Sequence, residues 1–227
     1  MWLQECWLQR STIRTLTEPY GSGYTDNMTS QIASISGKAD RAGRLSADDW
    51  AAAALQQIGE LGVPALAVEP LARRLGVTKG SFYWHFPTRD ALLQAALDRW
   101  EQYEQKQVFD RLESIGDARA RLQQLFQLVA HDGVSHVIYG QLLRAMDNPI
   151  VQPAVSRISR RRLEWVTDSF KRAGFDADTA RYRARLVYSA YIGFLQLNLQ
   201  LPQDRPPKEE YEAYVAHMMA TLIPKQG

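Results

Sequence analysis

The sequence is poor in the residues that build disulfides and metal sites. Its 227 residues include one cysteine, Cys6, and four histidines. A single cysteine excludes an internal disulfide. His131 and His136 are five residues apart, a spacing that does not place them on one helical face. Because structural zinc sites need clustered Cys and His ligands, we expect no metal and no other cofactor.

Long apolar runs are also missing. None approaches the roughly 20 residues that span a bilayer, and no charged start precedes an apolar stretch of about seven residues, as in a secretory signal. A Gly-rich phosphate loop, a nucleophile elbow and paired carboxylates do not appear after Gly116. We therefore expect a cytoplasmic, globular protein that is neither a membrane protein nor an enzyme.

Helical patterns begin after residue 44. Ser46 is a suitable cap for a first helix, and Asp49 lies three residues on, as in a capping box. Gly62 and Pro64 end this helix. Another long pattern starts at Asp90 and continues to about residue 112. Five more follow, at 117–132, 135–146, 150–173, 176–200 and 208–223. The fold class is therefore all-α.

Residues 71–89, LARRLGVTKGSFYWHFPTR, predict a helix-turn-helix. A short helix ends in Leu75, Gly76 breaks it, and a second short helix opens near Thr78. Two helices joined by a short turn containing glycine form this motif, and the second helix enters the DNA major groove. The stretch contains four basic residues and no acidic one. These basic residues are Arg73, Arg74, Lys79 and Arg89.

The second helix and the turn after it supply the expected DNA contacts. They are Thr78, Lys79, Gly80, Ser81, Tyr83, Trp84, His85 and Arg89. Lys79 suits a guanine edge or a phosphate, and Thr78 is the expected helix cap. Gly80 allows the backbone to approach DNA closely, or it merely weakens the helix. His85 suits a phosphate contact, or it packs under the turn as a neutral residue.

The run from Leu71 to Leu93 resembles the DNA-binding domain of TetR/AcrR-type transcriptional regulators, over about residues 45–105. The matching residues are Leu71, Ala72, Leu75, Gly76, Val77, Tyr83, His85, Phe86, Leu92 and Leu93. The resemblance also aligns Arg89 with the family's basic residue at the opening of the fourth helix, where it would hold a phosphate. Ala67 stands where the family usually has a Thr or Ser cap, so one backbone contact is missing.

Residues 1–43 differ from the rest of the chain. They are rich in Ser, Thr, Gly, Asn and Gln without a sustained period, which favours a disordered extension. The alternative is a basic arm that reaches DNA through Lys38, Arg41 and Arg44. Because proteins of the resembled family usually begin close to the first helix, Met28 is a second candidate for the initiator.

The resemblance implies a helix-turn-helix DNA-binding domain at 44–90 and a helical ligand-binding and dimerisation domain at 91–227. It implies a ligand pocket in the bundle and a dimer interface made by the last two helices. The expected pocket residues, suited to an apolar or aromatic molecule, are Phe126, Tyr139, Trp165, Tyr188 and Tyr191. The expected interface residues are Tyr188, Ile192, Leu195, Tyr214 and Met218. Arg157, Arg160, Arg161 and Arg162 are expected to form a solvated helix face.

These observations predict a repressor that binds a palindromic double-stranded DNA operator as a homodimer and is released by a small molecule. Two alternatives remain. One is a non-transcriptional DNA-binding protein, such as a nucleoid or division factor. The other is a small-molecule binding protein whose DNA reader has decayed, which the missing cap at Ala67 supports.

Overall fold

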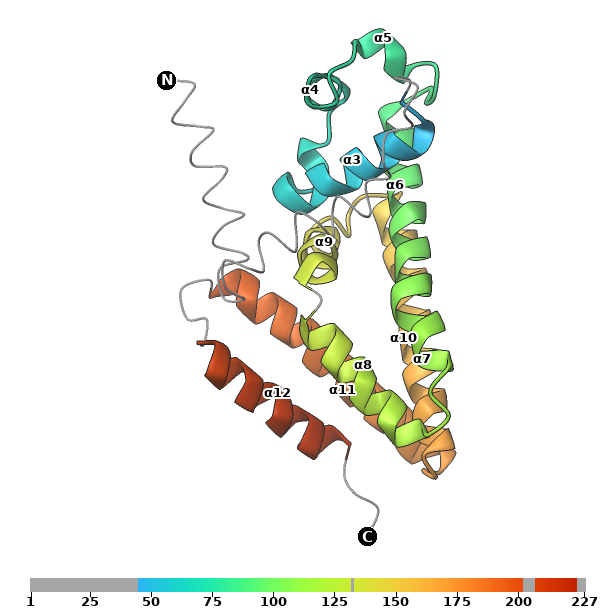
Figure 1. Cartoon of the computed structure of the whole chain (residues 1–227), viewed down its shortest axis with the longest axis vertical. Helices are drawn as coiled ribbons and strands as arrows, with labels where there is room; N and C mark the ends of the chain where they lie inside the picture. The colour runs from blue at the N-terminus through green and yellow to red at the C-terminus, as the bar shows by residue number, and fades with distance from the viewer. Residues whose placement is uncertain (1–44, 132, 202–206, 224–227) are drawn as a thin grey trace.

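The computed structural model describes residues 45–131, 133–201 and 207–223, and the extension expected at 1–43 lies outside these ranges. Within them every regular element is a helix (Figure 1), which confirms the all-α fold class. None of the helices in these ranges is long and apolar enough to cross a membrane.

The first helices form a compact unit at one end of the molecule. They are α3 (Ala47–Leu61), the 3-10 turn η2 (Val63–Ala65), α4 (Val68–Arg74) and α5 (Lys79–Phe82). α6 (Arg89–Glu104) leaves this unit and runs along the molecule. It continues through a π-helical turn, η3 (Gln105–Phe109), into α7 (Asp110–Glu113). The long helix expected from the sequence is therefore continuous but changes its winding near the middle of the molecule.

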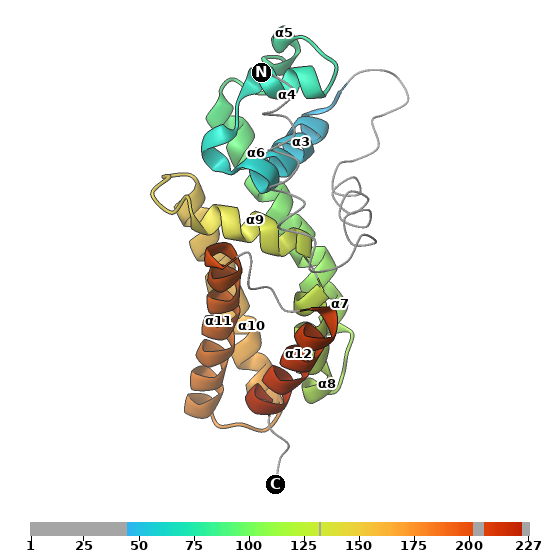
Figure 2. The ribbon, with the colours of Figure 1, turned by 90° about the vertical axis from the view of Figure 1, so that its left-hand side faces the viewer.

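Five helices form the rest of the structure. They are α8 (Ala118–His131), α9 (Gly133–Leu143), α10 (Val151–Arg172), α11 (Ala177–Gln200) and α12 (Lys208–Leu222). α9 crosses between the first unit and the longer helices (Figure 2). α10 and α11 pack together, and α8 contacts both α10 and α12. These bounds agree closely with the five helical patterns in the sequence.

Local signals fix several helix ends as expected. Ser46 and Asp49 form the capping box: the Ser46 side chain accepts from the Asp49 amide at 3.2 Å, and the Asp49 carboxylate accepts from the Ser46 amide at 2.8 Å. Gly76 has φ +70°, and the next amide, of Val77, donates to the Ala72 carbonyl at 3.0 Å. A glycine in the left-handed conformation, followed by an amide that bonds back to the helix, is a common C-terminal end of an α-helix.

One buried cluster extends from the first unit into the bundle. Trp50 of α3 packs edge-on against Phe82 of α5, with ring centroids 5.4 Å apart. The same cluster includes Leu97 and Trp100 of α6 and Tyr139 of α9. It therefore passes across the predicted domain boundary at residue 90, which lies in the first turn of α6. A second cluster joins α8, α10 and α11 around Phe170.

Candidate functional site

The turn after α5 exposes large aromatic side chains. Trp84 is 85% exposed and Tyr83 is 58% exposed, whereas Phe82 and Phe86 are buried beneath them. Lys79 lies on the same short helix and is exposed. Exposed aromatic rings with polar tips are well suited to a binding surface. Figure 1 places α5 at the extreme tip of the molecule, where a large partner can reach it.

The basic strip predicted at residues 71–89 is largely neutralised by acidic residues from outside it. The Arg74 guanidinium donates two hydrogen bonds to Glu60, at 2.6 and 2.7 Å, which raise the pKa of Arg74. Arg73 pairs with Glu69 at 3.3 Å. In the described ranges, Lys79 is the member of the strip that has no ion pair. The charge that the strip can offer a partner is therefore concentrated at Lys79.

Arg89 has a structural role that the sequence did not reveal. Its Nε donates to the Leu66 carbonyl at 3.1 Å and its Nη2 to the Val63 carbonyl at 2.8 Å. Its Nη1 pairs with Asp90 at 3.1 Å. These bonds tie the start of α6 to the loop that leads into α4. Only the remaining N–H groups of Arg89 are available for the predicted phosphate contact.

Thr78 and Ala67 mark the starts of the two motif helices. Thr78 occupies the cap position of α5, but its side chain accepts no capping hydrogen bond, so that part of the prediction was wrong. Ala67 begins α4 without a side-chain cap, as expected. Gly80 has open space where a Cβ would stand, apart from the Thr78 hydroxyl at 3.7 Å. Ser81 and His85 are half-buried, so they present less surface than their neighbours.

A second candidate site is a cavity enclosed by α6, η3 and the helices of the bundle. The centre of a water molecule can occupy about 110 Å³ of it. Since about 10–15 Å³ of such space holds one water, there is room for a small organic molecule. Four of the five expected pocket residues line it: Phe126, Trp165, Tyr188 and Tyr191.

Tyr139, the fifth expected pocket residue, does not line the cavity. It is fully buried behind the wall, where its ring stacks on Trp100 at 5.5 Å. Its hydroxyl bonds to Ser159 at 3.0 Å and to Tyr188 at 2.5 Å. Burial raises the pKa of Tyr139 and so keeps its hydroxyl a neutral hydrogen-bonding group. Its role is to hold the hydroxyl of Tyr188 in the wall.

The polar part of the wall is a buried ion pair between Glu104 of α6 and Arg162 of α10. Arg162 was expected on a solvated helix face, and this expectation was wrong. The sequence spacing already indicated that Arg162 is buried, because it lies four residues from both Ile158 and Val166, which are buried on the inward face of α10. Arg162 therefore occupies a core position of that helix.

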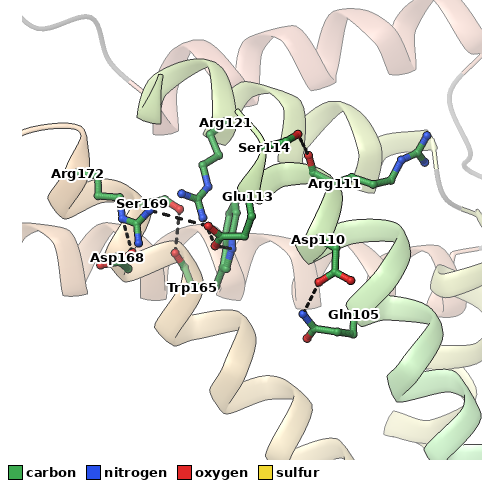
Figure 3. A network of polar contacts seen from close by, with 10 residues as sticks. All are labelled: Gln105, Asp110, Arg111, Glu113, Ser114, Arg121, Trp165, Asp168, Ser169 and Arg172. Carbon is green, nitrogen blue, oxygen red and sulfur yellow. Dashed lines mark hydrogen bonds and ion pairs between the residues drawn. The ribbon is translucent and has the colours of Figure 1, made fainter. Parts of the chain in front are cut away.

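Trp165, in the same wall, is held by a network at the far end of the bundle (Figure 3). Its indole Nε1 donates to Glu113 of α7 at 3.2 Å. Arg121 of α8 also pairs with Glu113, and its guanidinium carbon lies 4.6 Å from the Trp165 ring centroid. Arg172 bonds Asp168 at 2.7 Å and approaches Glu113 at 4.0 Å. Contacts to α7 and α8 thus fix the orientation of this ring.

The residues predicted for a dimer interface mostly face inward. Leu195 is 4% exposed in the main cluster, and Ile192 packs against that cluster half-buried. Tyr188 and Met218 line the cavity. The stripe chosen on α11 and α12 therefore packs largely within the chain, and its role in a dimer interface stays a prediction. Tyr214 remains exposed at 41%.

Comparison with known proteins identifies the N-terminal unit. Residues 51–96 match the family model described as bacterial regulatory proteins, tetR family. Over these residues the chain is similar to that family. It is 49% identical over 43 residues to the class A tetracycline repressor protein from transposon 1721 of Escherichia coli, a match that covers 19% of this chain and 20% of the repressor's length.

Solved structures share the fold over a longer range of the chain. A transcriptional regulator from Saccharomonospora viridis, determined in complex with choline, has a TM-score of 0.68 at 18% identity and covers 78% of this chain and 96% of its own. AibR, determined with isovaleryl coenzyme A and operator DNA, has a TM-score of 0.60 at 16% identity over 79% of this chain and 99% of its own. At these identities the likeness concerns the fold alone.

Replacing Arg89 with Met should lower the free energy of unfolding by about 1–3 kcal/mol, because two carbonyls lose a charged donor. The expected loss is moderated because the side chain is 33% exposed. Chemical denaturation of the purified protein measures it. Lys79→Met is the matched control, and we expect it to stay within about 0.5 kcal/mol of the parent protein. Equal stability of both variants would contradict the structural role of Arg89.

Proposed function

We propose that the protein is a DNA-binding transcriptional regulator, a repressor that binds a palindromic operator as a homodimer and is released by a small molecule in the cavity. The observation that carries the proposal is the exposed tip of the helix-turn-helix, where Trp84 and Tyr83 stand beside Lys79 in the region that matches the family model. The complex of AibR with operator DNA and a small molecule supports both partners for this fold.

On DNA, the opening of α5 enters the major groove. Thr78, Lys79 and Gly80 are exposed there and approach the base edges, with Ser81 beside them. Tyr83 and Trp84 contact the sugar-phosphate wall, which positions the reader without specifying sequence. His85 is half-buried and supports the turn from its edge. Since Arg89 is held by backbone carbonyls, it contributes to DNA binding mainly by fixing the angle of α6.

The ligand acts through α6, which begins beside the DNA reader and ends in the cavity wall. Glu104 is its last α-helical residue, and the π-helical turn follows directly. Turns of this kind are frequent at functional sites. A ligand that binds one placement of α6 better than another shifts the spacing of the two recognition helices by that difference in affinity. A spacing that no longer fits both half-sites releases the operator.

The dimer uses an exposed apolar face of α11, together with Tyr214 of α12. Tyr182, Leu186 and Leu197 are 64%, 58% and 55% exposed. Their spacing of four and eleven residues places them along one side of the helix. Gly193 lies on the same side and has open space around it. Pairing of this face with its symmetry mate gives an isologous two-fold interface.

A second candidate function rests on one observation. α4 begins at Ala67 without a side-chain cap, as expected for a DNA reader that has decayed in a small-molecule binding protein. Selection of bound sequences from a random duplex pool, with the purified full chain at near-physiological salt, separates the two functions. A regulator enriches a palindrome with half-sites about one helical turn apart, roughly 34 Å. No enrichment above nonspecific binding would reject the regulator and favour the second candidate.

Lys79→Ala should weaken binding to the selected duplex and reduce the magnitude of the salt slope by about one, as expected when one phosphate contact is lost. Fluorescence anisotropy over a range of salt concentrations measures both. Lys171→Ala, which removes the same charge from an exposed position on α10, is the control and should change neither. Identical slopes for Lys79→Ala and the parent protein would remove Lys79 from the contact surface.

Leu186→Glu should convert the dimer to a monomer, because each copy would place a carboxylate in the centre of the apolar contact. Sedimentation velocity measures the oligomeric state. Met146→Glu introduces the same charge at a side chain that is 38% exposed outside α11, and it should leave the dimer intact. A dimer that survives Leu186→Glu would place the interface elsewhere.

A further inference from the structure

The ion pair in the cavity wall is almost completely removed from water. The side chains of Glu104 and Arg162 are 3% and 14% exposed. The guanidinium carbon of Arg162 lies 4.3 Å from the ring centroid of Tyr139 and 5.5 Å from that of Tyr191. Burial by itself would lower the pKa of Arg162, but the Glu104 carboxylate and the nearby tyrosine hydroxyls raise it well above its ordinary value. The guanidinium therefore stays charged beside its carboxylate.

The charges of the wall balance each other. Glu104 and Arg162 are its acidic residue and its arginine, and its remaining polar side chains are Ser135, His136 and tyrosines. His136 packs against the rings of Tyr191 and Phe194, at 5.6 and 5.8 Å. Among the described residues that line the cavity, the formal charges of Glu104 and Arg162 sum to zero. The rest of the lining is apolar, so it offers little to stabilise an additional charge.

The pair has one hydrogen-bond donor without an acceptor. Arg162 Nη2 donates to Glu104, whereas Nη1 is buried and has no hydrogen-bond partner among the described residues. A buried donor without an acceptor is unfavourable, and a bound acceptor that meets it recovers that free energy. A carbonyl or ether oxygen supplies such an acceptor without adding charge.

We propose that the cavity selects uncharged ligands, each with an apolar or aromatic body and one oxygen acceptor that reaches Arg162 Nη1. A carboxylate would add a negative charge to this wall, or would break the ion pair between Arg162 and Glu104. An ammonium group would do the same with the opposite sign. Both are strongly unfavourable in a low-dielectric site. The inference rests on the proposed function, because it takes the cavity as the ligand site.

Three probes with one aromatic body test the selection: methyl 2-naphthoate, 2-naphthoate and 2-naphthylmethylammonium. Titration calorimetry with the full-length protein at neutral pH gives each dissociation constant. We expect the ester to bind at least tenfold more tightly than either ion. An ion that binds as tightly as the ester overturns the inference and leaves ligand control standing. If none of the three probes binds, the inference is overturned and the cavity loses its support as a ligand site. Operator binding by the ligand-free protein tests the DNA-binding function separately.

Variants of the pair should change the preferred charge. Glu104→Gln leaves Arg162 without its carboxylate, so we expect the ratio of naphthoate to ester affinity to rise at least tenfold. Arg162→Gln removes the positive charge of the pair and keeps the carboxylate of Glu104, so it should raise the ratio of ammonium to ester affinity instead. Glu101→Gln is the matched control: Glu101 pairs with Arg157 and Arg161 between the same two helices but does not line the cavity.

Unchanged preferences in both Glu104→Gln and Arg162→Gln would show that the pair does not set the selection, and the inference would be rejected. Circular dichroism and thermal unfolding establish that each variant is folded. If a variant does not fold, the comparison of the three probes on the parent protein decides alone.

Discussion

The burial of one face of α6 is the constraint that joins the two candidate sites. Leu92, Leu93, Ala96, Leu97 and Trp100 along this face are 0% exposed. The first half of the helix packs on α3, Trp100 stacks on Tyr139 of α9, and Glu104 pairs with Arg162 of α10. Because a close-packed interface shifts between discrete arrangements and does not deform gradually, the proposed mechanism requires a change in the cavity wall to reach the DNA reader as a displacement of the whole helix.

Those parts of the fold that depend on nearby residues could be predicted from the sequence. The capping box at Ser46 and the left-handed glycine at Gly76 are decided within a few residues of chain, and both formed as expected. The helices beyond residue 116 also followed from the 3.6-residue period. The apolar character of the cavity could be anticipated for the same reason, since Phe126, Trp165 and Tyr191 lie on faces that the helices must bury.

Those features that depend on partners far along the chain could not be predicted. Glu104 and Arg162 are 58 positions apart, and the carbonyl acceptors of Arg89 are 23 and 26 positions away. On α11, apolar residues occur on more than one side, so the period alone does not tell which side the chain buries within itself. Tertiary packing places Leu195 inside and leaves Leu186 outside.

Under the proposed function, the distribution of charge in the DNA reader makes dimerisation important for operator binding. Arg73, Arg74 and Arg89 of the predicted basic strip are engaged with acidic side chains or carbonyls, which leaves Lys79 and the aromatic side chains to contact DNA. A single reader of this kind gains little from long-range attraction to phosphates. Tight binding then requires both recognition helices of the dimer to bind at once. After the first helix has bound, the second meets its half-site at a high effective concentration only if the spacing of the two helices fits the DNA. Under the proposed mechanism, a small displacement of α6 is enough to prevent both recognition helices from binding together. A small molecule that fits the cavity can therefore control operator binding.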